Sequence, residues 1–369
     1  MSPHRRLDLD TFVAAIPPDQ LERYFENFDW EKRPEGWPIL NGSALGEFLD
    51  RPENAQFRGV VMEEFRRIND LCARNMNLLV TAYKRSSVDM QKDATAQTLA
   101  MRLYLDDADA FEYAWSRFLL FGGSPKLSIY PLPVLHLDIT NARIARFEAR
   151  LNQWFSDYAK GHCLVKVFDD KDESIIRISR GSYMRTVACW EGDQIGFTTF
   201  RPASEDVLAY NREASQLTIK ASLAKDRDEY MRSFAVCIAD DEALAATIGK
   251  GQVFSLVPIQ DGSFNFGGDG IIDGIELVKV RLKLAGPDEP EIEIRSKHVP
   301  DTVATYLRGL SLASGQLTYA RFRLVVRPLH GRPAAISFEI EPPARTDLAQ
   351  KRYADIIESY LREQKVKLA

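Results

Sequence analysis

The spacing of apolar side chains divides this sequence into a helical part and a β-rich part, and the division falls near residue 122. In the first part, apolar residues recur three and four positions apart, which places them on one face of an α-helix. The clearest stripe predicts a helix of about 30 residues that begins near Asn54, and its members are Phe57, Val61, Phe65, Ile68, Cys72, Met76, Leu79 and Tyr83. Shorter helices are expected at 8–16, 18–28, 43–50, 93–104 and 107–120.

The second part begins with one helix and then changes to alternating patterns. That helix is expected from Thr140, a capping residue, to Lys160, and Gly161 ends it. Alternation of apolar and polar residues then predicts strands at 163–168, 174–179, 184–190, 194–200, 205–210 and 216–221. A hairpin followed by a helix is expected three times, with the helices near 226–237, 301–312 and 347–363.

Together these patterns predict an α+β protein. A helical domain is expected at 1–122, and a β-rich domain at 123–369. The second domain should hold an antiparallel sheet with helices packed on one face and a C-terminal helix. The residues expected to dock that last helix are Tyr353, Ile356, Ile357, Tyr360 and Leu361.

Composition favours a cytoplasmic protein that does not enter a membrane. Hydrophobic residues make up 45% and charged residues 27% of the 369, as in ordinary globular chains. No apolar run approaches the length of a membrane-spanning helix, and the first residues lack the apolar core of a signal peptide. The four cysteines are widely spaced without a CxxC pair, so we expect free thiols rather than a zinc site or a disulfide framework.

Charge gives no sign of a broadly basic surface, because 53 acidic residues outnumber 48 basic ones. The arginine-rich hairpin "YARFRLVVRPLHGRPAAISFEIE" is expected to pair Leu324 with Phe338. That register would set Arg323 opposite Glu339 and Arg321 opposite Glu341.

The preceding hairpin is expected to cancel most of its charge in the same way. Its predicted register sets Lys283 near Glu291 and Arg281 near Glu293.

Two small groups of cations are left without an obvious partner. Arg327, His330 and Arg332 lie at the turn of the arginine-rich hairpin. Lys84, Arg85 and Lys92 lie near the end of the long helix and in the loop after it. These six residues are the candidate contacts to a nucleic acid or an acidic protein partner.

Catalytic motifs are sparse. The sequence contains no GxxxxGKS or GxxxxGKT, no HExxH and no GxSxG, which disfavours a P-loop nucleotidase, a zincin and an α/β-hydrolase. No cofactor is predicted. A divalent metal remains an alternative, with weak candidate ligands His136 and Asp138 on one strand and Asp269 and Asp273 in a glycine-rich loop.

Asp206 and Lys220 on successive strands also resemble part of a metal-dependent nuclease core. Such cores need a second carboxylate two residues before the lysine, and that position is Thr218. The missing carboxylate counts against this assignment.

Three aromatic residues in predicted strands admit two interpretations. On an open sheet face, Trp190, Phe197 and Phe200 would stack on bases. Packing in the core is the interpretation we favour from the sequence.

The function that fits these features is a non-catalytic binding subunit of a larger assembly. It would contact a nucleic acid or an acidic protein through local basic patches. A metal-dependent hydrolase or nuclease is one alternative, and a purely structural or oligomerising component is another. The sequence sets no oligomeric state.

Overall fold

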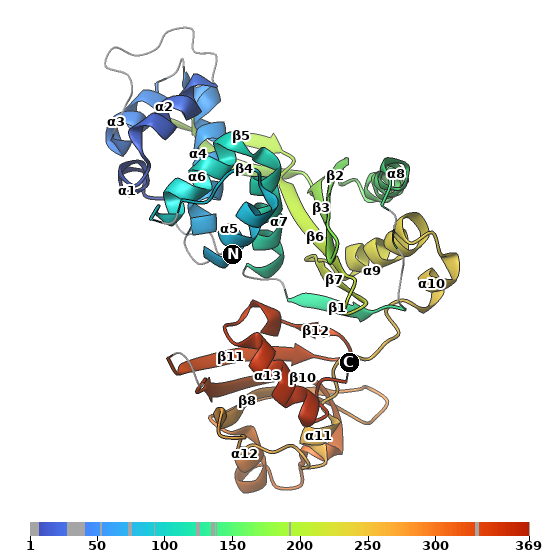
Figure 1. Ribbon diagram of the computed structural model, residues 1–369. Helices are drawn as coiled ribbons and strands as arrows, with labels where there is room; N and C mark the ends of the chain where they lie inside the picture. Colours follow the sequence, from blue (N-terminus) through green and yellow to red (C-terminus); the bar gives the residue numbers. More distant parts are fainter. Residues whose placement is uncertain are drawn as a thin grey trace. The chain divides into compact units, whose positions relative to one another are not determined.

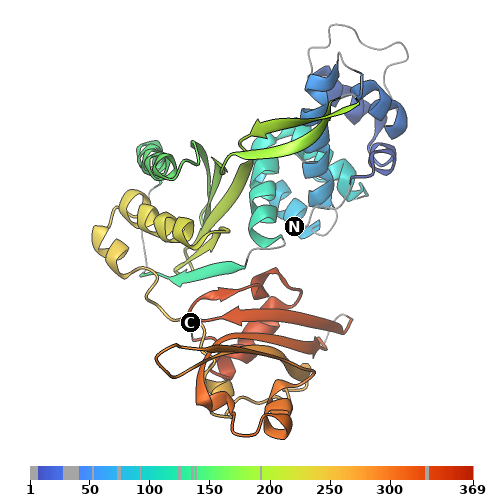
Figure 2. The same ribbon diagram turned by 180° about the vertical axis from the view of Figure 1, so that it is seen from behind.

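The structure is a computed structural model of the 369-residue chain, shown in Figures 1 and 2. It describes residues 7–27, 41–51, 54–72, 76–91, 93–122, 126–133, 137, 139–191, 193–328 and 332–368. Two compact units make up the chain, Met1–Gly123 and Ser124–Ala369. Each unit is described by itself.

The described secondary structure of the first unit consists of helices. Its helices are α1 (Leu9–Ala14), α2 (Pro18–Glu26), α3 (Gly42–Leu49), α4 (Ala55–Cys72), α5 (Met76–Arg85), α6 (Ala96–Asp106) and α7 (Ala108–Phe121). Side chains of Asp8, Asn41, Thr95 and Asp107 cap four of them by accepting backbone N–H bonds. The predicted long helix corresponds to α4 and α5, and residues 73–75 between them lie outside the described part.

The second unit is built on a ten-stranded sheet. Its elements begin with β1 (Leu127–Pro131), α8 (Asn141–Asp157), β2 (Cys163–Asp169), β3 (Glu173–Gly181), β4 (Arg185–Glu191), β5 (Gln194–Phe200), β6 (Ala203–Asn211), β7 (Gln216–Lys220), α9 (Ala224–Ser233), the π-helical turn Phe234–Ile238 and α10 (Glu242–Thr247). They continue with α11 (Val257–Gln260), β8 (Ile272–Leu284), β9 (Glu291–Arg295), α12 (Val299–Tyr306), β10 (Gly315–Val326), β11 (Ala334–Glu341), β12 (Arg345–Thr346) and α13 (Ala354–Glu363).

The strand order in this sheet is β2-β3-β6-β7-β1-β12-β11-β10-β8-β9, and every pairing is antiparallel. N-terminal helices, then a large antiparallel sheet and a C-terminal helix confirm the predicted α+β class. As predicted, Thr140 caps α8 by accepting the N–H of Arg143.

The sheet has a first half, β2-β3-β6-β7, and a second half, β12-β11-β10-β8-β9. The two halves carry their helices on opposite faces. β1 joins the halves, because it pairs with β7 on one side and β12 on the other. Tyr130 of β1 lies opposite Leu217 and belongs to the core under α8 and α9. Its neighbour Ile129 points to the other face and joins the core under α11, α12 and α13. Within each half, therefore, the described helices cover one face, as Figures 1 and 2 show.

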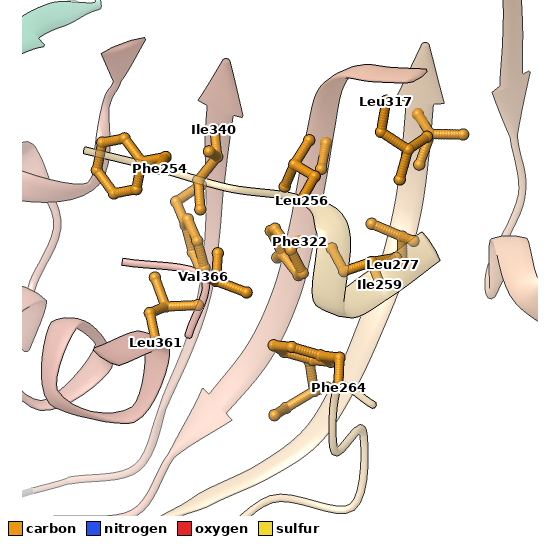
Figure 3. Packing of buried hydrophobic residues seen from close by; sticks show 14 of the residues in the cluster. Phe254, Leu256, Ile259, Phe264, Leu277, Leu317, Phe322, Ile340, Leu361 and Val366 are labelled. Atoms are coloured by element: carbon orange, nitrogen blue, oxygen red, sulfur yellow. The ribbon is translucent and has the colours of Figure 1, made fainter. Parts of the chain in front are cut away.

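The core of the second half is centred on aromatic rings from β10 and β11. Phe322 and Phe338 are fully buried and stack with their centroids 5.1 Å apart. Phe264, from the loop after α11, packs against Phe322 at 5.8 Å (Figure 3). Tyr360 and Leu361 of α13 close the same core, as predicted for the last helix.

The predicted register of the arginine-rich hairpin is wrong by two residues. Leu324 lies opposite Ile336, not Phe338, and Arg321 lies opposite Glu339. A shift of two residues leaves every side chain on the same face, so the apolar pattern allows both registers. Arg321 reaches Glu339 at 3.9 Å, whereas Arg323 is exposed opposite Ser337.

The register predicted for the preceding hairpin is confirmed, with Lys283 opposite Glu291 and Arg281 opposite Glu293. The ion pairs run diagonally across it. Lys279 contacts Glu293 at 2.7 Å, and Arg281 lies 3.8 Å from Glu291.

In the part of the chain that the structure describes, no helix combines the length and the apolar character needed to cross a membrane.

The stacked rings in β10 and β11 generate a stability prediction. Phe322→Ala should lower the unfolding free energy of the second unit by about 3–5 kcal/mol, because it removes a fully buried ring and leaves a cavity. Hydrogen exchange of peptides from β10 and β11, followed across a urea series, reports this unit separately. Arg323→Ala, on the exposed face of the same strand, is the control and should change little. Equal effects of the two substitutions would contradict the described core.

Candidate functional site: a β-arm with a buried root

Strands β4 and β5 form a two-stranded ribbon outside the ten-stranded sheet. β3 and β6 pair with each other as far as Gly181 and Ala203, and the ribbon continues from that end, as Figures 1 and 2 show. Three residues, 182–184, then lie opposite two, 201–202, before pairing resumes between Arg185 and Phe200. This extra residue is a β-bulge, which bends a ribbon and increases its twist. Residues 183–200 are called the arm below.

The arm exposes large apolar side chains. Trp190 is 75% exposed, Phe197 72% and Ile195 60%. The register places Trp190 opposite Ile195 and Ala188 opposite Phe197, so these four residues share one face, called the tip face. Val187 and Phe200, 42% and 43% exposed, lie on the other face, called the reverse face.

Exposed apolar residues are concentrated in this segment. Among the described residues, 17 large hydrophobic side chains are exposed, and seven of them lie in the arm: Tyr183, Met184, Val187, Trp190, Ile195, Phe197 and Phe200. Isolated exposed apolar residues are ordinary, but a contiguous group marks an interaction site. The core packing favoured from the sequence for Trp190, Phe197 and Phe200 is therefore wrong.

The root of the arm is held by Arg201 and two glycines. The guanidinium of Arg201 donates to the carbonyl oxygens of Ala159 at 2.6 Å and Ser182 at 2.8 Å. A Cβ on Gly181 would lie 2.2 Å from the carbonyl oxygen of Lys160 and 2.7 Å from Cδ of Arg201. Gly161 has a φ of +83°, in the region that favours glycine. A side chain at position 181 would therefore clash with the backbone, and one at position 161 would strain it.

Beneath the root lies a buried ion cluster, defined as Lys160, Arg180, Asp206, Asp226 and Tyr230. All five are at most 5% exposed. Lys160 Nζ lies 2.6 Å from both carboxylate oxygens of Asp226. Arg180 donates from Nε to Asp206 at 2.6 Å, and its Nη2 lies 3.4 Å from Asp226. Two cations thus face two carboxylates.

The phenol of Tyr230 completes the cluster. It donates to Asp206 at 2.7 Å. Burial and the nearby Asp206 raise the pKa of Tyr230 well above its ordinary value, so the phenol keeps its proton and remains a donor.

The cluster joins four segments at the place where the arm begins. Lys160 follows α8, Arg180 is the last residue but one of β3, Asp206 lies in β6, and Asp226 and Tyr230 belong to α9. A buried charge is costly without a partner, so these segments can pack only in the arrangement that pairs all four charges. The cluster therefore fixes the direction in which the ribbon leaves the sheet.

Three of the candidate binding cations belong to the second unit, and one of them forms an ion pair. Arg327 forms an ion pair with Asp273 at 3.2 Å, so one candidate cation meets one candidate metal ligand. Arg332 is exposed, and its carbonyl oxygen accepts the hydroxyl of Tyr353. His330 lies outside the described residues.

In the first unit, Lys84 is exposed in the last turn of α5, and Arg85 stacks on the ring of Tyr113 at 4.2 Å. Lys92 lies outside the described residues.

The two candidate metal ligands that the structure describes, Asp269 and Asp273, have other partners. Asp269 accepts the backbone N–H groups of Ile271 and Ile272, as in an Asx turn. His136 and Asp138 lie outside the described residues. Among the residues that are described, no three His, Cys, Asp or Glu side chains come together as a metal ion would require.

The pair of Asp206 and Lys220 lacks the geometry of a nuclease core. Lys220 lies directly opposite Val207, so it shares a sheet face with Val207 and not with Asp206. Asp206 instead belongs to the buried ion cluster.

Comparison of the sequence with protein-family models and with curated proteins returned no match.

The buried ion cluster predicts a large effect of removing one charge. Asp226→Ala leaves Lys160 buried without its counter-ion and should lower the unfolding free energy of the second unit by about 3–5 kcal/mol. Hydrogen exchange of β3 and β6 peptides across a urea series measures this. Asp273→Ala, which removes an exposed ion pair with Arg327, is the matched control and should change little. A variant as stable as the control would show that the cluster does not organise the root.

Lys220 generates a prediction about pH. Burial lowers its pKa to about 8, so above that pH the unfolded chain binds more protons than the folded one. Below pH 8 the cost of burying the charge is fully present, and it is relieved as pH rises towards 10. Lys220→Met should therefore exceed the wild type in unfolding free energy at pH 7 by up to about 3 kcal/mol. Urea unfolding should show that Lys220→Met is more stable than the wild type at pH 7 and that this advantage is lost at pH 10. An equal difference at the two pH values would contradict the lowered pKa of Lys220.

Proposed function

We propose that the protein is a non-catalytic binding subunit of a larger assembly, and that it contacts a protein partner through the arm. The observation that carries this proposal is the exposure of Trp190, Ile195 and Phe197 on one face of an anchored ribbon. Tryptophan is among the residues enriched in the few contacts that supply most of the binding free energy in protein interfaces.

The charge of the arm favours a protein over a nucleic acid. Residues 183–200 contain one basic residue, Arg185, and two acidic ones, Glu191 and Asp193, so 1 − 2 gives a net charge of −1. Proteins that stack bases on aromatic side chains combine them with a basic groove along the phosphates. The arm lacks that second feature. In this proposal Lys84 and Arg332 contribute secondary contacts to acidic groups of the assembly.

The rigid root supports binding as well. A segment already held in one conformation loses less conformational entropy when its partner binds. The hydrogen bonds of Arg201 and the charges of Lys160 and Arg180 supply that rigidity.

We place the assembly in the cytoplasm. The four cysteines Cys72, Cys163, Cys189 and Cys237 are all free thiols, which supports a reducing compartment.

Removal of the arm tests the proposal. Replacing residues 184–200 with an Asn-Gly turn would close β3 and β6 as a simple hairpin and leave Arg201 in place. The full-length chain, purified from its source cells, should carry a protein companion in fixed stoichiometry, and the shortened chain should lack it. The complex should form again when the two purified proteins are mixed.

Three results would count against this function. They are a companion retained by the shortened chain, a full-length chain without a companion, and a low-salt mobility shift with DNA or RNA that needs the arm. Low salt is the right condition because phosphate contacts are strongest there.

A further inference from the structure

We infer that the partner receives the arm in an apolar groove beside an open strand edge, with basic side chains at its rim. This inference rests on the proposed function and specifies the kind of partner. It follows from three properties of the arm, namely its area, its backbone edges and its charge.

Area argues against a flat, one-sided contact. An aromatic side chain offers about 150–250 Å² when fully buried. At 75% and 72% exposure, Trp190 and Phe197 can together bury about 220–370 Å², and Ile195 and Ala188 raise this to about 300–500 Å².

Two tip faces packed against each other would therefore bury about 600–1,000 Å² in total, at or below the roughly 1,000 Å² that a specific interface needs. Symmetric contact between two copies through these four side chains alone thus lies at or below the lower limit of a specific interface.

A groove that encloses the ribbon would bury more area than a contact with the tip face alone. Val187 and Phe200 on the reverse face are also exposed, so both faces of the ribbon can be buried at once. An enclosed ribbon gains the area of both faces and the contacts of its edges.

The backbone determines what the wall of such a groove must offer. Among the strands that the structure describes, β4 and β5 pair only with each other, so along each strand every second residue directs its N–H and C=O outwards. Burial of those groups without partners would be costly. The groove must therefore present an unpaired strand edge, to which the arm adds as a further strand.

The sequence of the arm is compatible with strand addition. Exposed edges are commonly protected by lysine or proline, and residues 183–200 contain neither. Thr186, Val187, Ile195, Thr198 and Thr199 are β-branched, as is favourable in strands.

Charge specifies the rim. Asp193 is exposed in the turn at the tip of the arm, whose net charge is −1. Lysine or arginine side chains at the rim of the groove would complement it and would repel competing basic segments.

The experiment uses the companion identified with the full-length chain, purified and titrated by calorimetry. The double variant Trp190→Ser, Phe197→Ser should weaken binding by about 30-fold or more. Val187→Ser should weaken it as well, because the groove covers the reverse face. Tyr306→Ser, which alters an aromatic side chain that is 77% exposed in α12, is the matched control and should bind as the wild type does.

Two further measurements test the groove itself. Hydrogen exchange of the complex should show amides of β4 or β5 that exchange quickly in the free chain and slowly when bound. Asp193→Lys should weaken binding, with an effect that decreases as salt is added.

The inference and the proposed function fail separately. If the shortened chain loses its companion while the tip-face variant and the amide exchange are unchanged, the groove is wrong and the binding function stands. If the shortened chain keeps its companion, the function itself is wrong.

Arm-dependent dimers in light scattering, or arm-dependent binding to vesicles of phosphatidylcholine and phosphatidylglycerol or to a single-stranded DNA oligonucleotide, would also overturn the groove.

Discussion

The ion pairs of Lys160 and Arg180 with Asp226 and Asp206 are the interactions on which the root of the arm depends. Removing such charges from water costs several kcal/mol per ion, and the cost is offset only when each charge meets its partner in good geometry. Because the four residues come from separate segments, this requirement fixes how α9 packs on β3 and β6. The same requirement gives the ribbon beyond β3 and β6 a single direction. Local charge pairing thus determines the placement of a surface feature.

Local patterns in the sequence predicted the elements well, because helix and strand periods depend on neighbouring residues. The cap at Thr140 and the strands between Cys163 and Lys220 are examples. Register was harder to predict. Lys283 and Glu291 were paired correctly, whereas the arginine-rich hairpin was misplaced by two residues. Alternation cannot distinguish two registers that differ by two residues. In the observed register Phe322 lies opposite Phe338, and the two rings stack.

The candidate site could be predicted only in part. The strands of the arm were predicted, but their exposure was not, because large aromatic side chains in strands usually pack in a core. Whether a strand is buried depends on where the sheet ends, and here the pairing of Gly181 with Ala203 ends it. The buried ion cluster was missed for a related reason. Lysine, arginine and aspartate are exposed in most proteins, and nothing in the sequence showed that Lys160 and Asp226 meet.

Estimates of the binding free energy indicate why a partner would bind the arm rather than a charged surface. Many cations of the second unit are engaged internally, such as Lys126 with Glu339 and Glu341. Burial of exposed apolar area would instead contribute about 25 cal/mol per Å² to binding, which is about 10 kcal/mol for about 400 Å² of tip face. Association itself costs about 4–15 kcal/mol, so this face alone would bind only marginally. Stable binding then requires the reverse face and the backbone edges as well, which only an enclosing partner engages.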